Sequence, residues 1–137
     1  GRRVTLCTDA AVASVIAREA IEAIVVGADT VLASGDVVNK TGTRGAALAA
    51  QHAGIPMIVV ATSDKVSPSD TPQLEDGAPA AIYNGEVEVQ VLNPTFDVTP
   101  AALVTHWVTE AGMVQQDAIS RYAAQHDQRR TWMASSE

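Results

Sequence analysis

Residues 23–44 read AIVVGADTVLASGDVVNKTGTR and join an apolar run to an acid, an amide and an ammonium group. The run from Ala23 to Val26 is stopped by Gly27, which is typical of a buried strand in an α/β sheet. Asp29 then falls at or just past the carboxyl end of that strand. Ligands of open α/β sheets bind outside this end of the strands. The stretch therefore predicts an α/β fold and a candidate site in the same place.

Apolar runs alternate with helical periods along the first half of the chain. Strands are expected over 4–7, 23–26 and 57–61, and helices over 9–22 and 43–52. Because helices connect successive strands, we expect those strands to lie parallel and each connection to be right-handed. We therefore expect one Rossmann-like, three-layer α/β domain over residues 1–137, with a mostly parallel sheet flanked by helices.

The second half of the chain has a less regular pattern. Residues 64–84 are rich in proline, serine and acids without a period, which indicates a surface loop or an insertion. Alternating Glu, Val and Gln predict a strand near the sheet edge over 86–92, followed by a turn over 93–97. Thr99 and Pro100 resemble a helix cap and a first-turn proline, so a helix is expected to about Glu110. A last helix is expected over 116–126, and a tail over 127–137 in which Trp132 and Met133 are apolar enough to dock on a partner.

Composition excludes several classes of protein. The net charge of −7 argues against a surface built to neutralise nucleic-acid phosphates. No run approaches the roughly 18 apolar residues of a membrane span, so no membrane partner is expected. A single cysteine and the lack of a signal pattern favour a reducing, cytoplasmic setting. His52, His106 and His126 have no second ligand at helical spacing, so no metal or other cofactor is expected.

Asn39, Lys40, Gly42 and Thr43 lie at the start of the helix expected over 43–52. A helix N-terminus offers free N–H groups and a positive dipole end to an anion such as phosphate, and Lys40 adds a full charge. A Walker A loop is rejected, because Asn39 stands where that motif needs glycine before lysine. An ordinary capped helix after a polar turn explains these residues equally well.

Asp29 also has two interpretations. It could satisfy backbone N–H groups as a turn residue, the commonest role of Asp after a strand. In a semi-apolar crevice, however, desolvation favours the protonated carboxyl group and suits a general acid, although a positive neighbour such as Lys40 opposes this. Lys65 follows the next expected strand and should lie at the same sheet edge. Cys7 is more typical of a small buried hydrophobe than of a nucleophile.

Several motifs at fixed spacing match a known family. They are Gly27-Ala28-Asp29, Gly35-Asp36, Asn39-Lys40, Gly42-Thr43, Ile55-Pro56, Lys65 and Asn93-Pro94-Thr95-Phe96-Asp97-Val98-Thr99-Pro100. Together they resemble the C-terminal domain of the initiation factor 2B α/β/δ and sugar-phosphate isomerase family, over roughly residues 4–122. The family includes ribose-1,5-bisphosphate and 5-methylthioribose-1-phosphate isomerases.

The resemblance implies a role for each matching residue. It implies that Asp29 is the proton donor, that Asn39, Lys40 and Lys65 hold a phosphorylated pentose, and that Gly42 and Thr43 support the phosphate loop. The family's base is a cysteine in a more N-terminal segment, whose position Cys7 does not match. The chain is therefore expected to lack the family's N-terminal helical domain and to be inactive alone.

Two functions remain open. The chain is either the substrate-binding domain of an aldose–ketose isomerase acting on a pentose 1-phosphate, or a regulatory subunit of the translation initiation factor 2B type that binds a sugar phosphate or nucleotide. A third possibility is an assembly scaffold with an empty pocket. Retention of Asp29 and Asn39-Lys40 favours the isomerase branch, whereas Ser34 and the residues before Lys65 depart from its pattern. The resemblance also implies a homodimer, a higher homo-oligomer, or assembly with related subunits.

Overall fold

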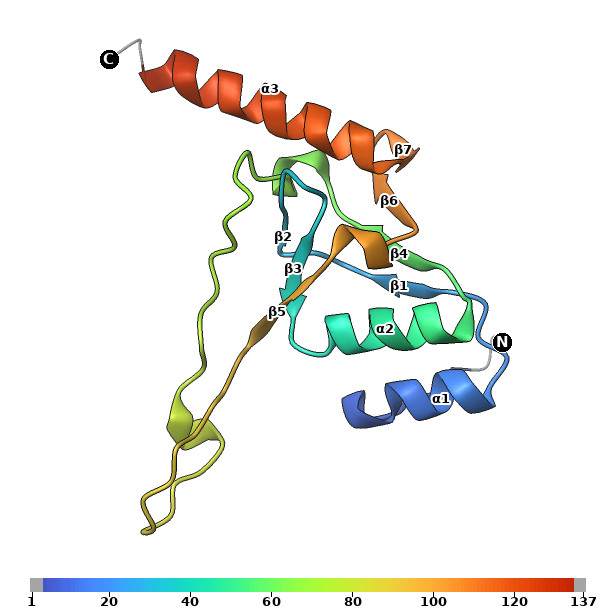
Figure 1. Ribbon diagram of the computed structural model, residues 1–137, viewed down its shortest axis with the longest axis vertical. Coiled ribbons are helices and arrows are strands. Elements are labelled where there is room, and N and C mark those ends of the chain that lie inside the picture. The colour runs from blue at the N-terminus through green and yellow to red at the C-terminus, as the bar shows by residue number, and fades with distance from the viewer. Residues whose placement is uncertain (1–3, 135–137) are drawn as a thin grey trace.

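The computed structural model describes residues 4–134 and has helices on both sides of two small sheets (Figure 1). The α-helices are α1 (Val12–Arg18), α2 (Thr43–Ala53) and α3 (Gln116–Ala134). The strands are β1 (Ile24–Val26), β2 (Thr30–Val31), β3 (Val37–Lys40), β4 (Met57–Val60), β5 (Phe96–Thr99), β6 (His106–Thr109) and β7 (Gly112–Val114). Short 3-10 turns cover Asp9–Ala11, Ser63–Lys65, Pro79–Ala81 and Ala101–Leu103.

The larger sheet has the strand order β1-β4-β6-β7. β1 pairs with β4 and β4 with β6 in parallel, while β7 returns antiparallel beside β6. The register places Ile58 opposite both Val25 and His106. The expected α/β class, with a mostly parallel sheet flanked by helices, is thereby confirmed.

A second, antiparallel sheet of β2, β3 and β5 was not predicted. Its strands lie in segments expected to be a polar loop (29–42) and a turn (93–97), and β2 has only two residues. Segments this short do not display a two-residue period, so sequence pattern alone cannot reveal them. Gly35, with φ +91°, makes the tight turn between β2 and β3.

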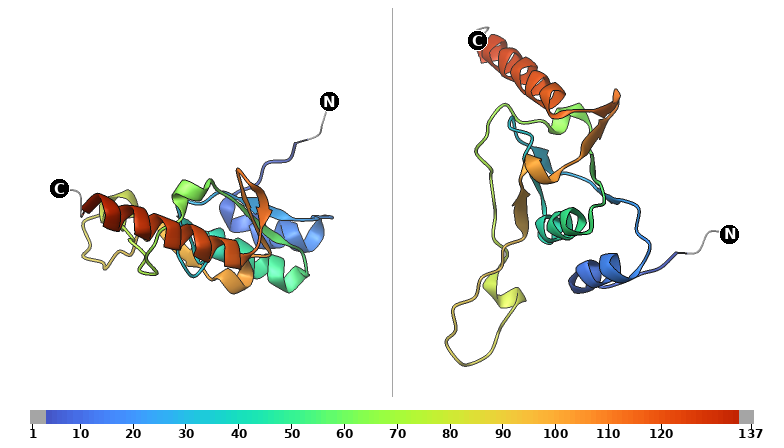
Figure 2. Two further views of the ribbon diagram at one scale, coloured as in Figure 1. Left: turned by 90° about the horizontal axis from the view of Figure 1, so that it is seen from above. Right: turned by 45° about the vertical axis from the view of Figure 1, so that its right-hand side comes forward.

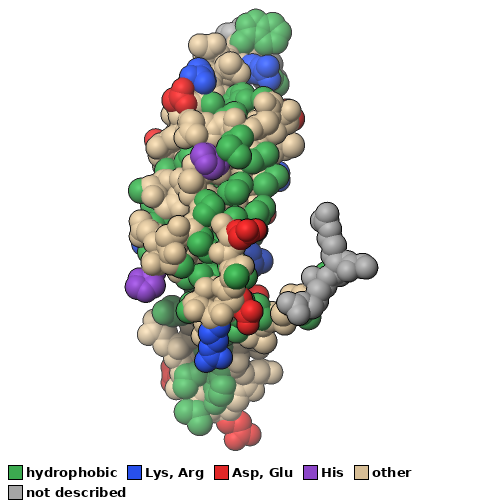
Figure 3. All heavy atoms as spheres, turned by 90° about the vertical axis from the view of Figure 1, so that its right-hand side faces the viewer, with side chains coloured by type: hydrophobic (Ala, Val, Ile, Leu, Met, Phe, Trp, Pro, Cys, Tyr) green, Lys and Arg blue, Asp and Glu red, His purple; other side chains and the backbone are tan. Residues whose placement is uncertain are grey.

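Both sheets contribute to one core, and α3 closes it. Its buried members are Val31, Val37, Val59, Val66, Ala101, Val104, Trp107, Ile119 and Ala123. A second cluster joins Ala47 and Ala50 of α2 to Met57 of β4. Within residues 4–134 the opposite face of the larger sheet carries exposed Val25, Val60 and Met113. Hydrophobic side chains also gather over the middle of the face seen in Figure 3.

The helix expected from Pro100 to Glu110 is wrong. Only a 3-10 turn follows Pro100, and the rest forms the β6–β7 hairpin, whose return strand begins at Gly112 with φ +97°. The segment VTHWVT is dominated by β-branched and aromatic residues. These side chains favour a strand, and this preference outweighs the capping signal before them.

Two expected strands are also wrong. Residues 4–8 and 84–93 form no strand, and Leu6 is 96% and Val87 69% exposed. Most of the segment 67–95, here called the arm, extends away from the body in Figure 1 and in the right-hand view of Figure 2. An N–H···O bond of 2.7 Å from Gly77 to the Asn93 carbonyl joins the two sides of the arm.

The last helix is longer than predicted. α3 continues to Ala134, so most of the expected tail is helical, whereas residues 135–137 lie outside the described part of the chain. Across residues 4–134, no helix combines the length and apolar character that a membrane crossing needs.

Candidate functional site

The parallel pairing of β1 and β4 brings Asp29 and Lys65 to one cleft. Both strands run in the same direction, so the segments that leave their carboxyl ends meet at one edge of the sheet. A parallel bridge between Val31 and Val66 holds the two segments together. The cleft has a volume of about 440 Å³. Its lining residues are Asp29, Thr30, Leu32, Val38, Asp64, Lys65, Val66, Ser67, Pro68, Thr71, Gln73, His126 and Arg130.

A smaller cavity of about 230 Å³ adjoins this cleft and shares Asp29 with it. Phe96 of β5 forms part of its wall. The Nζ atom of Lys40 lies 4.7 Å from the centre of the Phe96 ring, within the range of a cation–π contact. Lys40 is thus beside the smaller cavity, although it lines neither space.

Asn39 is directed toward the start of α2 instead. Its Nδ2 donates to the Thr43 hydroxyl at 3.1 Å, and that hydroxyl donates to the Lys40 carbonyl at 2.7 Å. Since side chains alternate along a strand, Asn39 is on the opposite face of β3 from Val38, which lines the cleft. The structure therefore brings Asp29 and Lys65 together, keeps Lys40 nearby, and ties Asn39 to the α2 turn.

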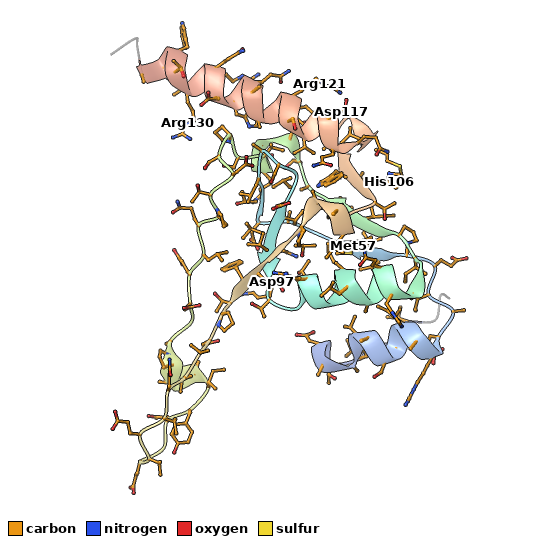
Figure 4. All side chains as sticks on the ribbon, in the orientation of Figure 1. Met57, Asp97, His106, Asp117, Arg121 and Arg130 are labelled. Carbon is orange, nitrogen blue, oxygen red and sulfur yellow. The ribbon has the colours of Figure 1, made fainter. Side chains whose placement is uncertain are left out.

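The N-terminus of α2 is already capped by a carboxylate. Asp97 of β5 (labelled in Figure 4) accepts the N–H of Gly42 at 2.8 Å and the N–H of Arg44 at 3.1 Å through Oδ2. A negative group at this position is favoured by the helix dipole. In this conformation two of the N–H groups that could bind a phosphate are occupied, and Gly42 and Thr43 lie where the turn after β3, the strand of Asn39 and Lys40, leads into α2.

A contact from the β6–β7 hairpin positions Lys65. Glu110 accepts the Ser63 N–H at 2.9 Å and the Ser63 hydroxyl at 2.5 Å. Ser63 begins the 3-10 turn that ends at Lys65. These hydrogen bonds, the hydroxyl one first, lower the pKa of Glu110 below its ordinary value. The hairpin thus anchors the segment that carries the lysine.

The cleft holds free charges of both signs. Asp29, Lys65 and Arg130 make no hydrogen bond or ion pair through their side chains within residues 4–134, and all three are exposed. His126 and Arg130 were not predicted to be site residues. Their i, i+4 spacing places them on one helix face. This relation was not predicted, because the helix was expected to end at His126 and Arg130 was assigned to the tail.

The lone cysteine belongs to a different cavity. Cys7 is exposed and lines a space with Thr5, Val15 and residues 19–21 near α1. No side chain of the Asp29 cleft lines that space. Among the described residues, no group of three His, Cys, Asp or Glu side chains is placed to hold a metal ion.

Comparison with known proteins gives consistent matches. The Initiation factor 2 subunit family matches residues 1–116. Methylthioribose-1-phosphate isomerase of Heliobacterium modesticaldum is 42% identical over 127 residues, covering 82% of this chain and 36% of the relative. Among solved structures, 5-methylthioribose 1-phosphate isomerase from Pyrococcus horikoshii OT3 aligns with a TM-score of 0.77 and 34% identity, over 91% of this chain and 37% of that one.

A second solved structure has a different function in its name. The translation initiation factor eIF-2B subunit delta from A. fulgidus aligns with a TM-score of 0.70 and 30% identity, covering 81% of this chain and 35% of that one. The chain thus spans somewhat more than a third of the length of the relatives it matches. Because the family match covers most of its length, the chain belongs to the Initiation factor 2 subunit family.

Proposed function

We propose that the chain is the substrate-binding part of an aldose–ketose isomerase that acts on a pentose 1-phosphate. One observation carries this proposal: Asp29 and Lys65, which follow the ends of two adjacent parallel strands, line the same cleft, and their side chains have no partner within residues 4–134. The similarity to methylthioribose-1-phosphate isomerases supports the substrate class. The remaining steps follow from the chemistry of such a sugar.

A sugar phosphorylated on its anomeric oxygen cannot open its ring spontaneously. An acid must protonate the ring oxygen as the ring opens, and a base must move a proton between the first two carbons. In the proposal Asp29 is the acid. Lys65 in the cleft and Lys40 beside it supply positive charge for the phosphate and hydroxyl groups, and Gly42 and Thr43 support the turn that follows Lys40.

The base is assigned to a group outside this cleft. The family resemblance gives that role to a cysteine, and Cys7 lines a separate cavity. Asp29 is exposed, so in the proposal a further segment or subunit covers the cleft and excludes water from it. The proposal therefore predicts that the chain alone binds the sugar phosphate without converting it.

Calorimetric titration with methylthioribose 1-phosphate, ribose 1,5-bisphosphate and a purine nucleotide tests the proposal. Intact chain should bind a sugar phosphate, Lys65→Ala should bind it about tenfold or more weakly, and Asp29→Asn should bind it with little change. Asp29→Asn keeps the side-chain shape but cannot act as an acid. Lack of sugar-phosphate binding by the intact chain would contradict the proposal, and turnover by the chain alone would contradict the assignment of the base.

A regulatory subunit of the translation initiation factor 2B type is the second candidate. The observation that favours it is the similarity to the A. fulgidus delta subunit, at 30% identity and a TM-score of 0.70. In that case the same cleft would bind a sugar phosphate or nucleotide as a signal, and the surface would bind related subunits. Preference for the purine nucleotide in the same titration would favour this function over the enzyme. Light scattering would show whether the chain forms the homodimer that the resemblance implies.

A further inference from the structure

We propose that Arg130 of α3 is the phosphate-binding residue of the cleft and acts together with Lys65. This inference deepens the proposed function and rests on it. The family match covers residues 1–116, and Arg130 lies outside that range. α3, which carries Arg130, begins at the last residue of that match.

α3 is fixed to the body along its first half. Ala118, Ile119 and Ala123 are buried against the core, with 8%, 1% and 4% of their surface exposed. The next inward-facing residue, His126, lies 2.8 Å through Nδ1 from the Val66 carbonyl oxygen. Because a carbonyl oxygen only accepts, Nδ1 carries the hydrogen in this contact. Val66 directly follows Lys65, so this bond ties α3 to the lysine segment.

Arg130 lies one helical turn beyond that anchor. The i, i+4 spacing puts it on the same helix face as His126, and both line the cleft with Lys65 and Asp29. In Figure 4 its side chain points from α3 toward the chain that follows β4. By contrast, Arg121 is paired with Asp117 at 2.6 Å on the exposed part of the helix.

The charges of the cleft match a phosphorylated sugar. Lys65 and Arg130 are its cations, and Asp29 and Asp64 are its carboxylates. A guanidinium group presents a planar fork of donors that binds phosphate oxygens in pairs, and Arg130 has no competing partner among the described residues. At the other candidate for binding the phosphate, the start of α2, the N–H groups of Gly42 and Arg44 already donate to Asp97. The geometry therefore places the phosphate between Lys65 and Arg130, and the sugar ring toward Asp29.

The test compares Arg130→Ala with Arg129→Ala in the intact chain. Arg129 is the matched control, because it belongs to the same helix and is exposed but does not line the cleft. Binding of methylthioribose 1-phosphate should weaken about 10- to 100-fold in Arg130→Ala and change less than about twofold in Arg129→Ala. Arg130→Lys should fall between wild type and Arg130→Ala, because it keeps the charge and loses the fork.

Titration with unphosphorylated methylthioribose tests whether Arg130 contacts the phosphate. If it does, wild type and Arg130→Ala should bind this unphosphorylated sugar with the same affinity. Wild-type affinity for the sugar phosphate in Arg130→Ala, together with weakened binding in Lys65→Ala, would overturn the role of Arg130 and leave the proposed function standing. No binding of the sugar phosphate by the intact chain would overturn both. Circular dichroism of each variant checks that α3 is retained.

Discussion

Asp97→Ala should destabilise the protein through the N-terminus of α2, although Asp97 lies 53 residues after Arg44 in sequence. Its carboxylate accepts the N–H groups of Gly42 and Arg44. Loss of a side-chain cap costs about 1 kcal/mol, within a range of about 0.5–2. Loss of a favourable charge at the positive end of the helix dipole adds roughly 0.3–1 kcal/mol. We therefore expect a loss of about 1.5–2 kcal/mol in the free energy of unfolding, which is more than tenfold in the folding equilibrium.

Urea unfolding followed by circular dichroism measures this change, with the slope of the transition unchanged. Asp97→Asn keeps a carbonyl oxygen as an acceptor but removes the charge, so it should lose about half as much. Asp117→Ala is the control, since it removes an exposed pair with Arg121, worth at most about 0.5 kcal/mol, and a charge in the first turn of α3, but no hydrogen bond to the backbone within residues 4–134. Equal unfolding midpoints for Asp97→Ala and Asp117→Ala would refute the capping role.

Three further perturbations test other parts of the fold. Val59→Ala should lower the free energy of unfolding by about 2 kcal/mol, because Val59 is 0% exposed. Val25→Ala, on the exposed face of the larger sheet, should lower it by less than about 0.5 kcal/mol in the same urea assay. For Glu110, whose pKa is lowered by its hydrogen bonds to Ser63, the stabilisation is fully present above the ordinary pKa of 4.5 and is lost as pH falls through the lowered value. The difference in urea midpoint between wild type and Glu110→Gln should accordingly shrink on acidification, and a difference that grows would contradict this assignment. Gly35→Ala should destabilise by at least about 1–2 kcal/mol, since φ is +91° and the added Cβ would lie 3.1 Å from a side-chain carbon; an unchanged melting temperature would show that the turn relaxes.

The sequence was informative wherever one element carried a strong local signal. The apolar runs over 23–26 and 57–61 predicted β1 and β4, and their parallel pairing is confirmed. The helix that begins at Thr43 has the expected first residue and ends one residue beyond the predicted end. Two strand ends at one sheet edge were enough to predict that Asp29 and Lys65 lie together, because parallel pairing fixes the direction in which each chain leaves the sheet.

The remaining features depend on contacts between distant segments, which local pattern does not encode. β3 and β5 form through mutual pairing, as when Asn39 faces Asp97 across the ladder. The orientation of Asn39 toward Thr43 could not be read from the adjacency of Asn39 and Lys40 in sequence. Arg130 enters the cleft because α3 continues past its predicted end and packs on the core.

Mapping a bound sugar phosphate on the backbone amides by NMR tests the location of the site most directly. Titration with methylthioribose 1-phosphate should shift the amides of residues 29–31, 65–67 and 126–130 first, since these segments line the cleft. The amides of Gly42 and Arg44 should move little, because Asp97 holds them. Shifts concentrated at the start of α2, with residues 65–67 and 126–130 unchanged, would contradict the account.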